Sequence, residues 1–423
     1  MSDQKLKICL VGQKIQIQSR SSDTGLLWPI AQGLTKLGHD VTIISDSSYL
    51  KKAEVLRDQI KAYYLYDEQN YYSKSISFQK LIYKKFIQLH KKNNFDLVHS
   101  LDDSGYEIGR HKKAIGIRMA YDINAIHLST LFSILTENNG SLQSLIKTSL
   151  KIGFKFLQKY FLYDRSLLQT ADGMFTTTSQ QRTLLENYYL YPDYHTYTVP
   201  YGIHLGSLDE RSEPENLKLK YQIPENSGLV IAFSDFSSST ELEPLLQAFK
   251  KILLKDSNFY LVILGDGSQW KKTEYSIFKN VLSSRVKLIN DAEDSDLLNF
   301  ICACDVYVNL SARTTGLEPS MIEAMAQKKI VISSELSPIS SYITHQENGF
   351  LVRPADQEMI TKLLTSILYK KNDFDYSAIG ECARSKVLDS FNRENMINAL
   401  VQSYNQIISK SHSPRPKIKR RDS

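Results

Sequence analysis

Two carboxylates, Glu318 and Glu323, lie in the segment "TTGLEPSMIEAMAQKK" (residues 314–329), where a polar loop leads into a helical pattern. Pro319 suits the first helical position, because its missing N–H would have no partner there. Gly316 permits a sharp turn or a close approach of the backbone to a ligand. A helix N-terminus offers free N–H groups and the positive end of the helix dipole, which favour a phosphate. Glu323, about one turn inside the helix, can accept hydrogen bonds from sugar hydroxyls. The segment therefore predicts a site for a phosphate and a polyol, although an ordinary helix cap explains the same residues.

A loop of this kind connects a strand to a helix. Apolar runs typical of strands alternate with helical patterns along most of the chain. "KICLV", "DVTIIS", "DLVHS" and "GMFTTTS" are strand-like runs in the first half. The pattern restarts with "LVIAFS", "FYLVILGDG", "RVKLI", "DVYVNLS", "IVISS" and "GFLV" in the second half. Short buried strands separated by helices indicate a parallel sheet covered on both faces. We predict an α/β fold of two doubly wound units, with ligands bound beyond the carboxyl ends of the strands and in the cleft between the units.

The domain boundaries follow from this alternation. We expect a first domain over residues 1–203, a second over 204–388, a C-terminal helix over 389–409 and a basic disordered tail over 410–423, with a hinge near residues 202–214. The C-terminal helix is expected to pack back on the first domain, because four apolar side chains share one of its faces. These are Met396, Leu400, Tyr404 and Ile407.

The composition is that of a soluble globular protein, with 42% apolar and 23% charged residues. No stretch approaches the roughly 18–20 unbroken apolar residues of a membrane span. The N-terminal segment "MSDQKLKICLVGQKI" is too short and too polar for a signal peptide. The four cysteines show no metal-site or redox spacing and are interpreted as small buried apolar residues. We therefore expect a cytoplasmic protein.

Five segments, in order, resemble motifs of one enzyme family. "GLTKLGHDVTIIS", "VPYGIHL", "FYLVILGDGSQW", "TGLEPSMIEAMAQKKIVISS" and "NGFLVRPAD" are similar to segments of the retaining family-4 glycosyltransferases, also called glycosyl transferases group 1. That family has the GT-B fold, in which two Rossmann-like domains face each other across a cleft. The resemblance runs over nearly the whole chain.

The resemblance implies a role for each matching residue. Glu323 would bind the ribose of a nucleotide-sugar donor, while the backbone N–H groups of Gly316 and Leu317 would meet the diphosphate and the sugar. The base would lie near Lys287 and Leu288. The donor phosphate would assist departure of the leaving group with retention of anomeric configuration, and neither a metal ion nor another cofactor is expected.

Several positions depart from the family pattern. Thr315 stands where the first acid of the E-x7-E pair is expected, and Glu318 is the nearest substitute. Asp235 and Thr240 stand where the family has the Arg and Lys that clamp the diphosphate. A charge-assisted hydrogen bond contributes about 1.5–3 kcal/mol, so the loss of two such donors weakens donor binding unless other cations compensate. Arg20 and Arg313 are the candidates, although each is more often a surface charge.

The expected first-domain histidine falls on Asn124, unless His127 serves instead as the acid/base group. A histidine beyond a strand end is more often a structural residue.

Basic residues in the first domain and the tail raise a possible contact with an anionic membrane. Four lysines at four-residue steps share one slowly drifting helix face, and a solvated outer helix explains them equally. They are Lys147, Lys151, Lys155 and Lys159. No recognition motif accompanies this charge, so nucleic-acid binding is not expected.

The sequence as a whole favours a hexosyltransferase that moves a sugar from a nucleotide diphosphate donor to a saccharide or lipid-linked acceptor. The alternative is a catalytically silent GT-B protein that serves as a binding or scaffolding partner in glycan assembly, which Asp235, Thr240 and Thr315 motivate.

Overall fold

The chain folds into two compact units, each described here by itself. The first unit takes the described parts of residues 1–131, 150–203 and 392–423, and the second takes those of residues 204–391. The computed structural model describes residues 5–13, 27–46, 54–65, 75–126, 163–202, 217–234, 236, 241–255, 258–265, 267, 269–290, 294–310, 319–336, 339–353, 356–369 and 374–410.

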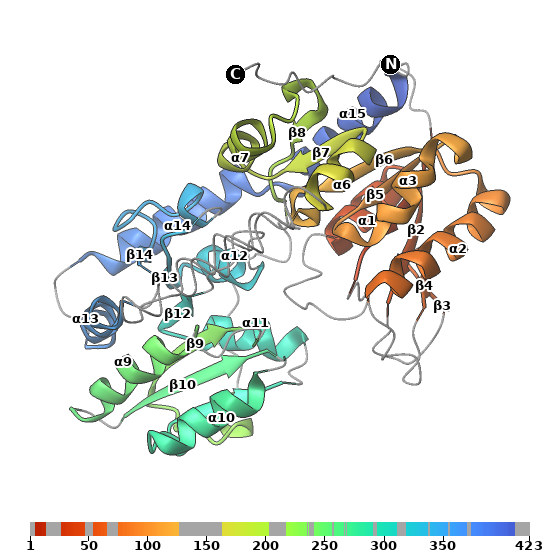
Figure 1. Cartoon of the computed structure of the whole chain (residues 1–423). Coiled ribbons are helices and arrows are strands. Elements are labelled where there is room, and N and C mark those ends of the chain that lie inside the picture. Colours follow the sequence, from red (N-terminus) through yellow and green to blue (C-terminus); the bar gives the residue numbers. More distant parts are fainter. Residues whose placement is uncertain are drawn as a thin grey trace, which may run out of the picture. The chain divides into compact units, whose positions relative to one another are not determined.

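The first unit is built on an eight-stranded sheet within the described residues (Figure 1). Its strands lie in the order β3-β4-β2-β1-β5-β6-β7-β8. They are β1 (Lys7–Val11), β2 (Asp40–Ser45), β3 (Glu54–Arg57), β4 (Ile60–Tyr64), β5 (Leu97–Ser100), β6 (Arg118–Asp122), β7 (Gly173–Thr176) and β8 (Thr196–Thr198). All neighbours pair in parallel except β3 and β4. The apolar runs predicted as buried strands therefore form this sheet.

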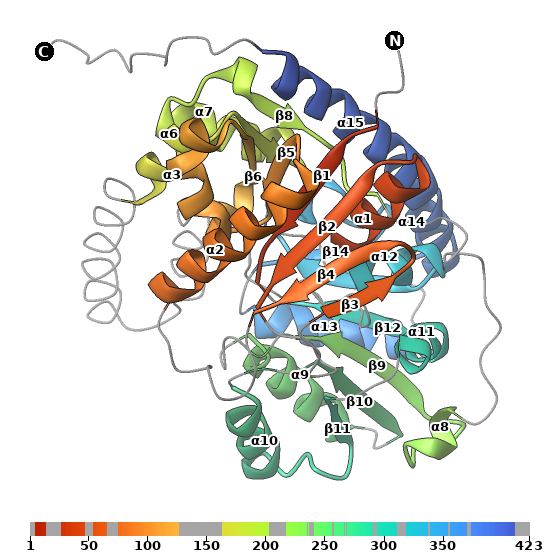
Figure 2. The ribbon, with the colours of Figure 1, turned by 90° about the vertical axis from the view of Figure 1, so that its right-hand side faces the viewer.

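The antiparallel pair β3–β4 was not predicted from the sequence (Figure 2). Asp58 and Gln59 join the two strands, and both have positive φ, 50° and 66°. A two-residue turn of this backbone type is usually marked by Asn-Gly or Asp-Gly. Because Gln59 replaces the expected glycine, the turn carries no recognisable sequence signal.

The helices of the first unit are α1 (Leu27–Lys36), α2 (Ser75–Asn93), α3 (Tyr106–Ile115), α6 (Arg165–Thr170), α7 (Ser179–Tyr189) and α15 (Arg393–Ser409). Helix α15 packs against α1, and its four predicted apolar residues are each at most 1% exposed. A Cβ on Gly33 of α1 would lie 2.4 Å from Ile397, so the two helices approach closely at that glycine. The prediction that the C-terminal helix packs on the first unit is confirmed.

The second unit has a six-stranded parallel sheet within the described residues, in the order β11-β10-β9-β12-β13-β14. The strands are β9 (Gly228–Phe233), β10 (Phe259–Leu264), β11 (Val286–Ile289), β12 (Val306–Asn309), β13 (Ile330–Ser334) and β14 (Phe350–Val352). Numbered within the unit, this order is 3-2-1-4-5-6, the doubly wound order whose direction reverses between the first and fourth strands. The predicted α/β fold with two Rossmann-like units is confirmed.

Alternate residues of each strand of the second unit serve the two faces of the sheet. Val230, Leu261 and Val306 share one core with the helices α9 (Glu243–Leu253), α10 (Trp270–Lys279) and α13 (Gln357–Leu368). Tyr307 points to the opposite face, where its hydroxyl meets Ser320 of α12 (Pro319–Ala326). Helix α12 contacts α11 (Asp294–Ala303) and α14 (Tyr376–Ser390). The short helix α8 (Leu217–Lys220) precedes β9.

The cysteines depart in part from the prediction. Cys9, Cys302 and Cys304 are buried, but Cys382 is exposed, because α14 turns that position away from the core. The interpretation of Cys382 as a buried apolar residue was wrong.

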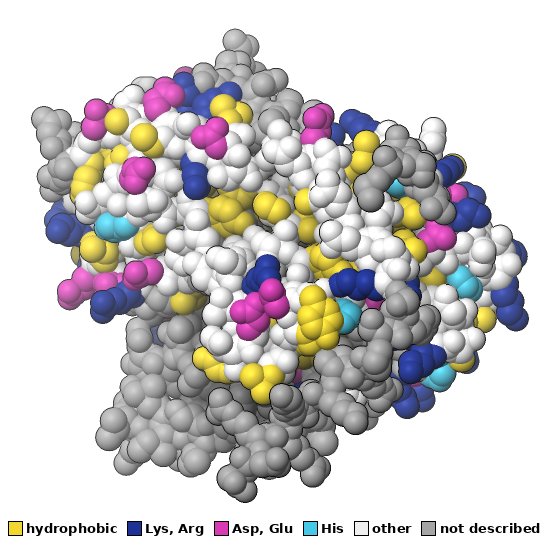
Figure 3. All heavy atoms as spheres, turned by 90° about the horizontal axis from the view of Figure 1, so that it is seen from above, with side chains coloured by type: hydrophobic (Ala, Val, Ile, Leu, Met, Phe, Trp, Pro, Cys, Tyr) yellow, Lys and Arg dark blue, Asp and Glu magenta, His cyan; other side chains and the backbone are white. Residues whose placement is uncertain are grey.

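Two surface properties bear on the partners of the chain. Within the described residues, every helix is too short or too polar to span a bilayer. On the face shown in Figure 3, basic and acidic side chains are interspersed. This pattern differs from the continuous basic stripe expected of a nucleic-acid-binding face.

Candidate functional site

The loop predicted to hold phosphate leaves β12 and enters α12, which begins at Pro319 as expected. Ser320, in the first turn of α12, exchanges a 2.6 Å hydrogen bond with the hydroxyl of Tyr307 on β12. Both groups are buried, so this bond fixes the start of α12 against the sheet. The Ser333 hydroxyl donates to the carbonyl of Asn309, the last residue of β12, at 3.0 Å. The end of β12 and the start of α12 therefore form a rigid base for the loop.

Glu323 is buried in α12, with 8% of its surface exposed. Its neighbours Met321, Ile322, Ala324 and Met325 are fully buried apolar residues. A carboxylate in such a helix must be offset by polar partners, because its desolvation is costly. An acidic residue retained at this position favours a binding role over a solvated helix face.

The floor of the site is the point where the strand order of the second unit reverses. There β9 and β12 pair side by side in parallel, and in doubly wound folds ligands bind beyond the carboxyl ends of the strands at such a point. Ser234, directly after β9, is 5% exposed, and its hydroxyl accepts the backbone N–H of Phe236 at 3.0 Å. The ends of β9 and β12 therefore lie side by side at the reversal point, where the ligand site was predicted.

Gly265 lies just after β10, close to the backbone that follows β9. Its φ is +133°, and a Cβ there would lie 1.8 Å from the carbonyl oxygen of Ser234. Only glycine allows the chain after β10 to pass this close to the chain after β9. This glycine belongs to the "LGDG" segment singled out in the sequence.

Lys287 and Leu288, predicted near the base, lie on the edge strand β11 and are half-buried. β10 and β9 separate β11 from β12, so these residues lie roughly 14 Å from β12 along the sheet. They belong to the same unit as Glu323, which stands on α12. Leu288 also packs on the core of α9, α10 and α13.

The other predicted site residues fall outside the described residues. They are Arg20, His127, Arg313, Thr315, Gly316, Leu317 and Glu318, together with Asp235 and Thr240 of the altered clamp. The lysine series of residues 147–159, the hinge and the basic tail of residues 411–423 also fall outside them. Their roles stay predictions.

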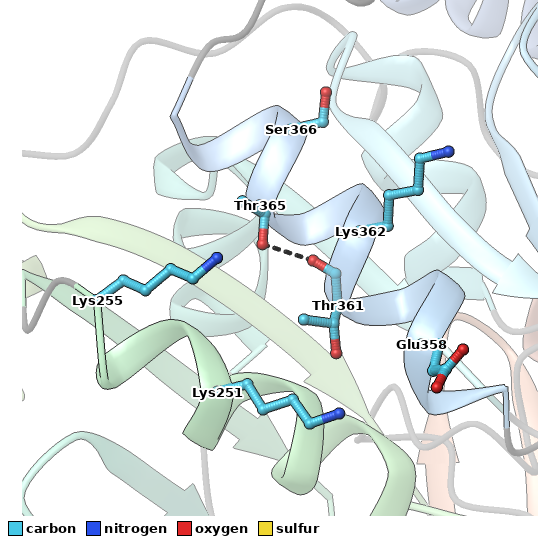
Figure 4. Close-up of a pocket in the computed structure, with 7 residues that line it drawn as sticks. All are labelled: Lys251, Lys255, Glu358, Thr361, Lys362, Thr365 and Ser366. Carbon is cyan, nitrogen blue, oxygen red and sulfur yellow. Dashed lines mark hydrogen bonds between the residues drawn. The ribbon is translucent and has the colours of Figure 1, made fainter.

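A groove of about 350 Å³ lies elsewhere on the second unit, between α9 and α13 (Figure 4). Lys251 and Lys255 extend from the α9 side toward α13, which contributes Glu358, Thr361, Lys362, Thr365 and Ser366. None of the predicted donor-site residues lines this groove. Because α9 and α13 cover the sheet face opposite to α12, the groove is distinct from the predicted donor site at Glu323.

The sequence reasoning missed a polar cluster at the carboxyl edge of the first sheet. Asp102, just after β5, accepts the backbone N–H of Gln13 at 2.7 Å and that of Ser104 at 2.8 Å. It thereby links the segments after β1 and β5, which pair at the point where this sheet reverses its strand order. Burial raises the pKa of Asp102 to about 6, against the lowering effect of these hydrogen bonds. The signal was the pair of acids in "HSLDDSG", directly after a buried strand.

A second buried network lies beneath that edge. His99 on β5 is 1% exposed; its Nδ1 lies 2.7 Å from the Tyr404 hydroxyl and its Nε2 lies 3.0 Å from Asp122. Asp122 ends β6, while Tyr404 comes from α15, more than 280 residues later. This pairing of distant residues has no local sequence signal.

The second unit carries the chain's similarity to a known family. Residues 214–385 match the family model described as glycosyl transferases group 1. The N-acetyl-alpha-D-glucosaminyl L-malate synthase of Bacillus anthracis is 25% identical over 207 residues, which are 48% of this chain and 52% of the relative. The lipopolysaccharide 1,2-N-acetylglucosaminetransferase of Salmonella typhimurium is 26% identical over 197 residues, 44% of this chain and 50% of the relative. The matches thus span about half the length of these relatives.

Solved structures match the fold over almost the whole chain. The sucrose-phosphate synthase of Thermosynechococcus elongatus superimposes with a TM-score of 0.74 at 17% identity, covering 96% of this chain and all of that chain. HepE of Anabaena, solved in complex with UDP and glucose, gives a TM-score of 0.66 at 16% identity, covering 95% of this chain and 99% of that chain. Residues 214–385 of this chain therefore resemble the group 1 glycosyl transferases, and the chain has the GT-B fold.

Proposed function

We propose that this chain is a retaining glycosyltransferase that moves a hexose from a nucleotide diphosphate sugar to a saccharide or lipid-linked acceptor. The family match over residues 214–385 supports this proposal, as do relatives named as glycosyl-transferring enzymes and a structural neighbour bound to UDP and glucose. The proposal keeps the cytoplasmic location expected from the sequence.

One observation carries the proposal: Glu323 is a buried carboxylate on the helix that follows β12, where the strand order reverses. In the proposed complex Glu323 accepts hydrogen bonds from the ribose hydroxyls. The N–H groups of Gly316 and Leu317 bind the diphosphate, and Lys287 and Leu288 lie toward the base. Arg313 and Arg20 replace the missing cationic clamp.

The proposed reaction exchanges one bond at the anomeric carbon for another. The bond from this carbon to the diphosphate oxygen breaks, and the acceptor oxygen bonds to the same face of the sugar. The nucleoside diphosphate leaves with the electron pair, and its phosphate oxygen takes the acceptor proton. Glu318 and Thr315 would orient the donor sugar, and His127 would assist the proton transfer. The proposal requires no metal ion.

Binding of nucleotide sugars to a Glu323→Gln variant tests the role of Glu323. The substitution keeps the side-chain shape but removes the charge, so donor affinity measured by calorimetry should fall roughly 10- to 150-fold, the loss expected for charge-assisted hydrogen bonds. Glu347→Gln removes a carboxylate from an exposed turn and serves as the control. Thermal melting of both variants separates lost binding from lost folding.

A panel of uridine, guanosine and adenosine diphosphate sugars, each assayed with and without a chelator, tests the reaction itself. Transfer or donor hydrolysis that survives the chelator is the expected result. A folded wild-type protein that binds none of the donors would overturn the proposal and favour the catalytically silent alternative.

A further inference from the structure

The outward face of α10 carries aromatic rings where a solvated helix carries polar side chains. Thr273 and Ile277 are buried and mark its inner face. At 100° per residue, Phe278 and Tyr275 project from the opposite side, with 73% and 66% of their surfaces exposed. Two such rings expose on the order of 300 Å² of largely apolar surface. Their position opposite the core means that folding of the unit does not account for them.

Two aliphatic residues extend this apolar surface. Val281, just beyond α10, is 85% exposed with φ +58°, a backbone conformation that β-branched residues rarely adopt. Leu254, just beyond α9, is 82% exposed. The two helix ends are held together, because the Asn280 side chain accepts hydrogen bonds from Gln247 and Lys250 of α9 at 3.2 Å. Because most of its side chain is exposed, Val281 adds apolar surface to this face rather than to the core.

Lysines surround these apolar side chains. Lys271, Lys272 and Lys279 lie on the exposed side of α10, where Glu274 is the acidic neighbour. Lys251 and Lys255 continue the positive charge along α9 to the groove against α13 (Figure 4). No ion pair within the described residues involves any of these five lysines.

We propose that this face, formed by the outer sides of α10 and the end of α9, docks the chain on an anionic lipid surface. Exposed rings flanked by lysines are the pattern of a helix lying in a membrane interface: the rings enter the acyl boundary, and the ammonium groups reach lipid phosphates. The lysines favour an anionic partner over a neutral or basic one, and the exposed rings of Tyr275 and Phe278 favour a lipid surface, whose acyl boundary can take them up. The inference goes beyond the proposed transferase activity, since docking requires no donor.

Flotation with lipid vesicles tests the proposal on the full chain. Wild type should float with vesicles of phosphatidylglycerol and phosphatidylcholine, but weakly with phosphatidylcholine alone. Affinity should fall on the order of tenfold for each ring removed in Tyr275→Ser/Phe278→Ser. It should fall roughly fivefold for each lysine neutralised in Lys271→Gln/Lys272→Gln/Lys279→Gln. All these side chains are exposed, so thermal melting should be unchanged.

A matched apolar pair on the first unit provides the control. Leu190 and Tyr194 are 65% and 58% exposed, but they belong to the first unit and not to the face formed by α10 and the end of α9. Leu190→Ser/Tyr194→Ser should therefore float as wild type does. If Tyr275→Ser/Phe278→Ser also floats as wild type does, another segment carries the membrane contact and the proposal is wrong. Failure of wild type to float overturns it as well.

Penetration depth gives a second readout that does not depend on a loss. In Phe278→Trp, the added indole should be quenched by brominated lipid and should shift its emission to the blue when anionic vesicles are added. Leu56→Trp, at a 67% exposed site on β3, should show neither change. Equal responses from the two probes would contradict docking through α10.

Discussion

At the scale of single residues, Gly265 allows the backbone after β10 to pass close to the backbone after β9. Alanine there combines a positive φ with a Cβ 1.8 Å from a backbone oxygen that cannot rotate away. We expect Gly265→Ala to lower the free energy of unfolding by more than about 3 kcal/mol, as strain and overpacking add. Gly116 has φ +81° with open space around its Cβ position, so Gly116→Ala isolates the strain, at about 1–2 kcal/mol. Denaturant unfolding of both variants measures the difference; equal losses would show that the backbone contact does not matter.

Asp102 makes stability depend on pH. Burial raises its pKa from 3.8 to about 6, so between these pH values the folded chain keeps a proton that the unfolded chain has released. This contribution to stability is fully present below about pH 4 and is lost as the pH rises through 6. Wild type should therefore lose on the order of 1–3 kcal/mol relative to Asp102→Asn across this window. Melting curves from pH 4 to 7 measure it, with Asp389→Asn as a surface reference. A constant difference between wild type and Asp102→Asn would contradict a raised pKa.

At the scale of elements, the sequence pattern predicted those features that depend on neighbouring residues alone. The buried strands and the apolar stripe of α15 follow from burial alone, and Pro319 marks the start of α12 because proline suits that position. The β3–β4 turn was not predicted, because its positive φ values fall on Asp58 and Gln59 rather than on glycine. The contact of His99 with Tyr404 was not predicted, because tertiary packing alone brings β5 and α15 together.

That contact makes α15 more than an apolar cover. Tyr404→Phe would leave Nδ1 of buried His99 without its hydroxyl partner, at a cost of about 1–3 kcal/mol. The hydroxyl of Tyr197 accepts from Lys410 at a more exposed place, so Tyr197→Phe should cost less than about 1 kcal/mol. Urea midpoints at equal m-values measure both losses. If Tyr404→Phe loses no more stability than Tyr197→Phe, the hydrogen bond between His99 and Tyr404 does not stabilise the packing of α15.

At the scale of the whole molecule, two units with the same reversal of strand order follow from one repeated pattern of strand and helix. That repetition is why the fold could be predicted from short motifs. The donor site could be predicted only in part, because Glu323 stands on a packed helix whereas most of its expected partners lie in segments whose sequence shows no strand or helix period. Loop conformation depends on tertiary contacts, which neither hydrophobic periodicity nor secondary-structure propensity predicts. The ordered motifs therefore identify the architecture more firmly than the ligand contacts.

The first unit is completed by residues that follow the second in the sequence. Met396, Leu400 and Ile407 of α15 fill its core, and each large apolar side chain contributes about 1.5–3 kcal/mol when buried. Deleting residues 393–423 should therefore unfold the first unit selectively. Amide hydrogen exchange would show β1 and β2 losing protection while β9 and β12 keep theirs. Deleting residues 411–423 leaves α15 intact and should change neither set. If β1 stays protected without α15, the helix covers the unit without stabilising it, and the low exposure of its apolar face does not reflect a contribution to the core.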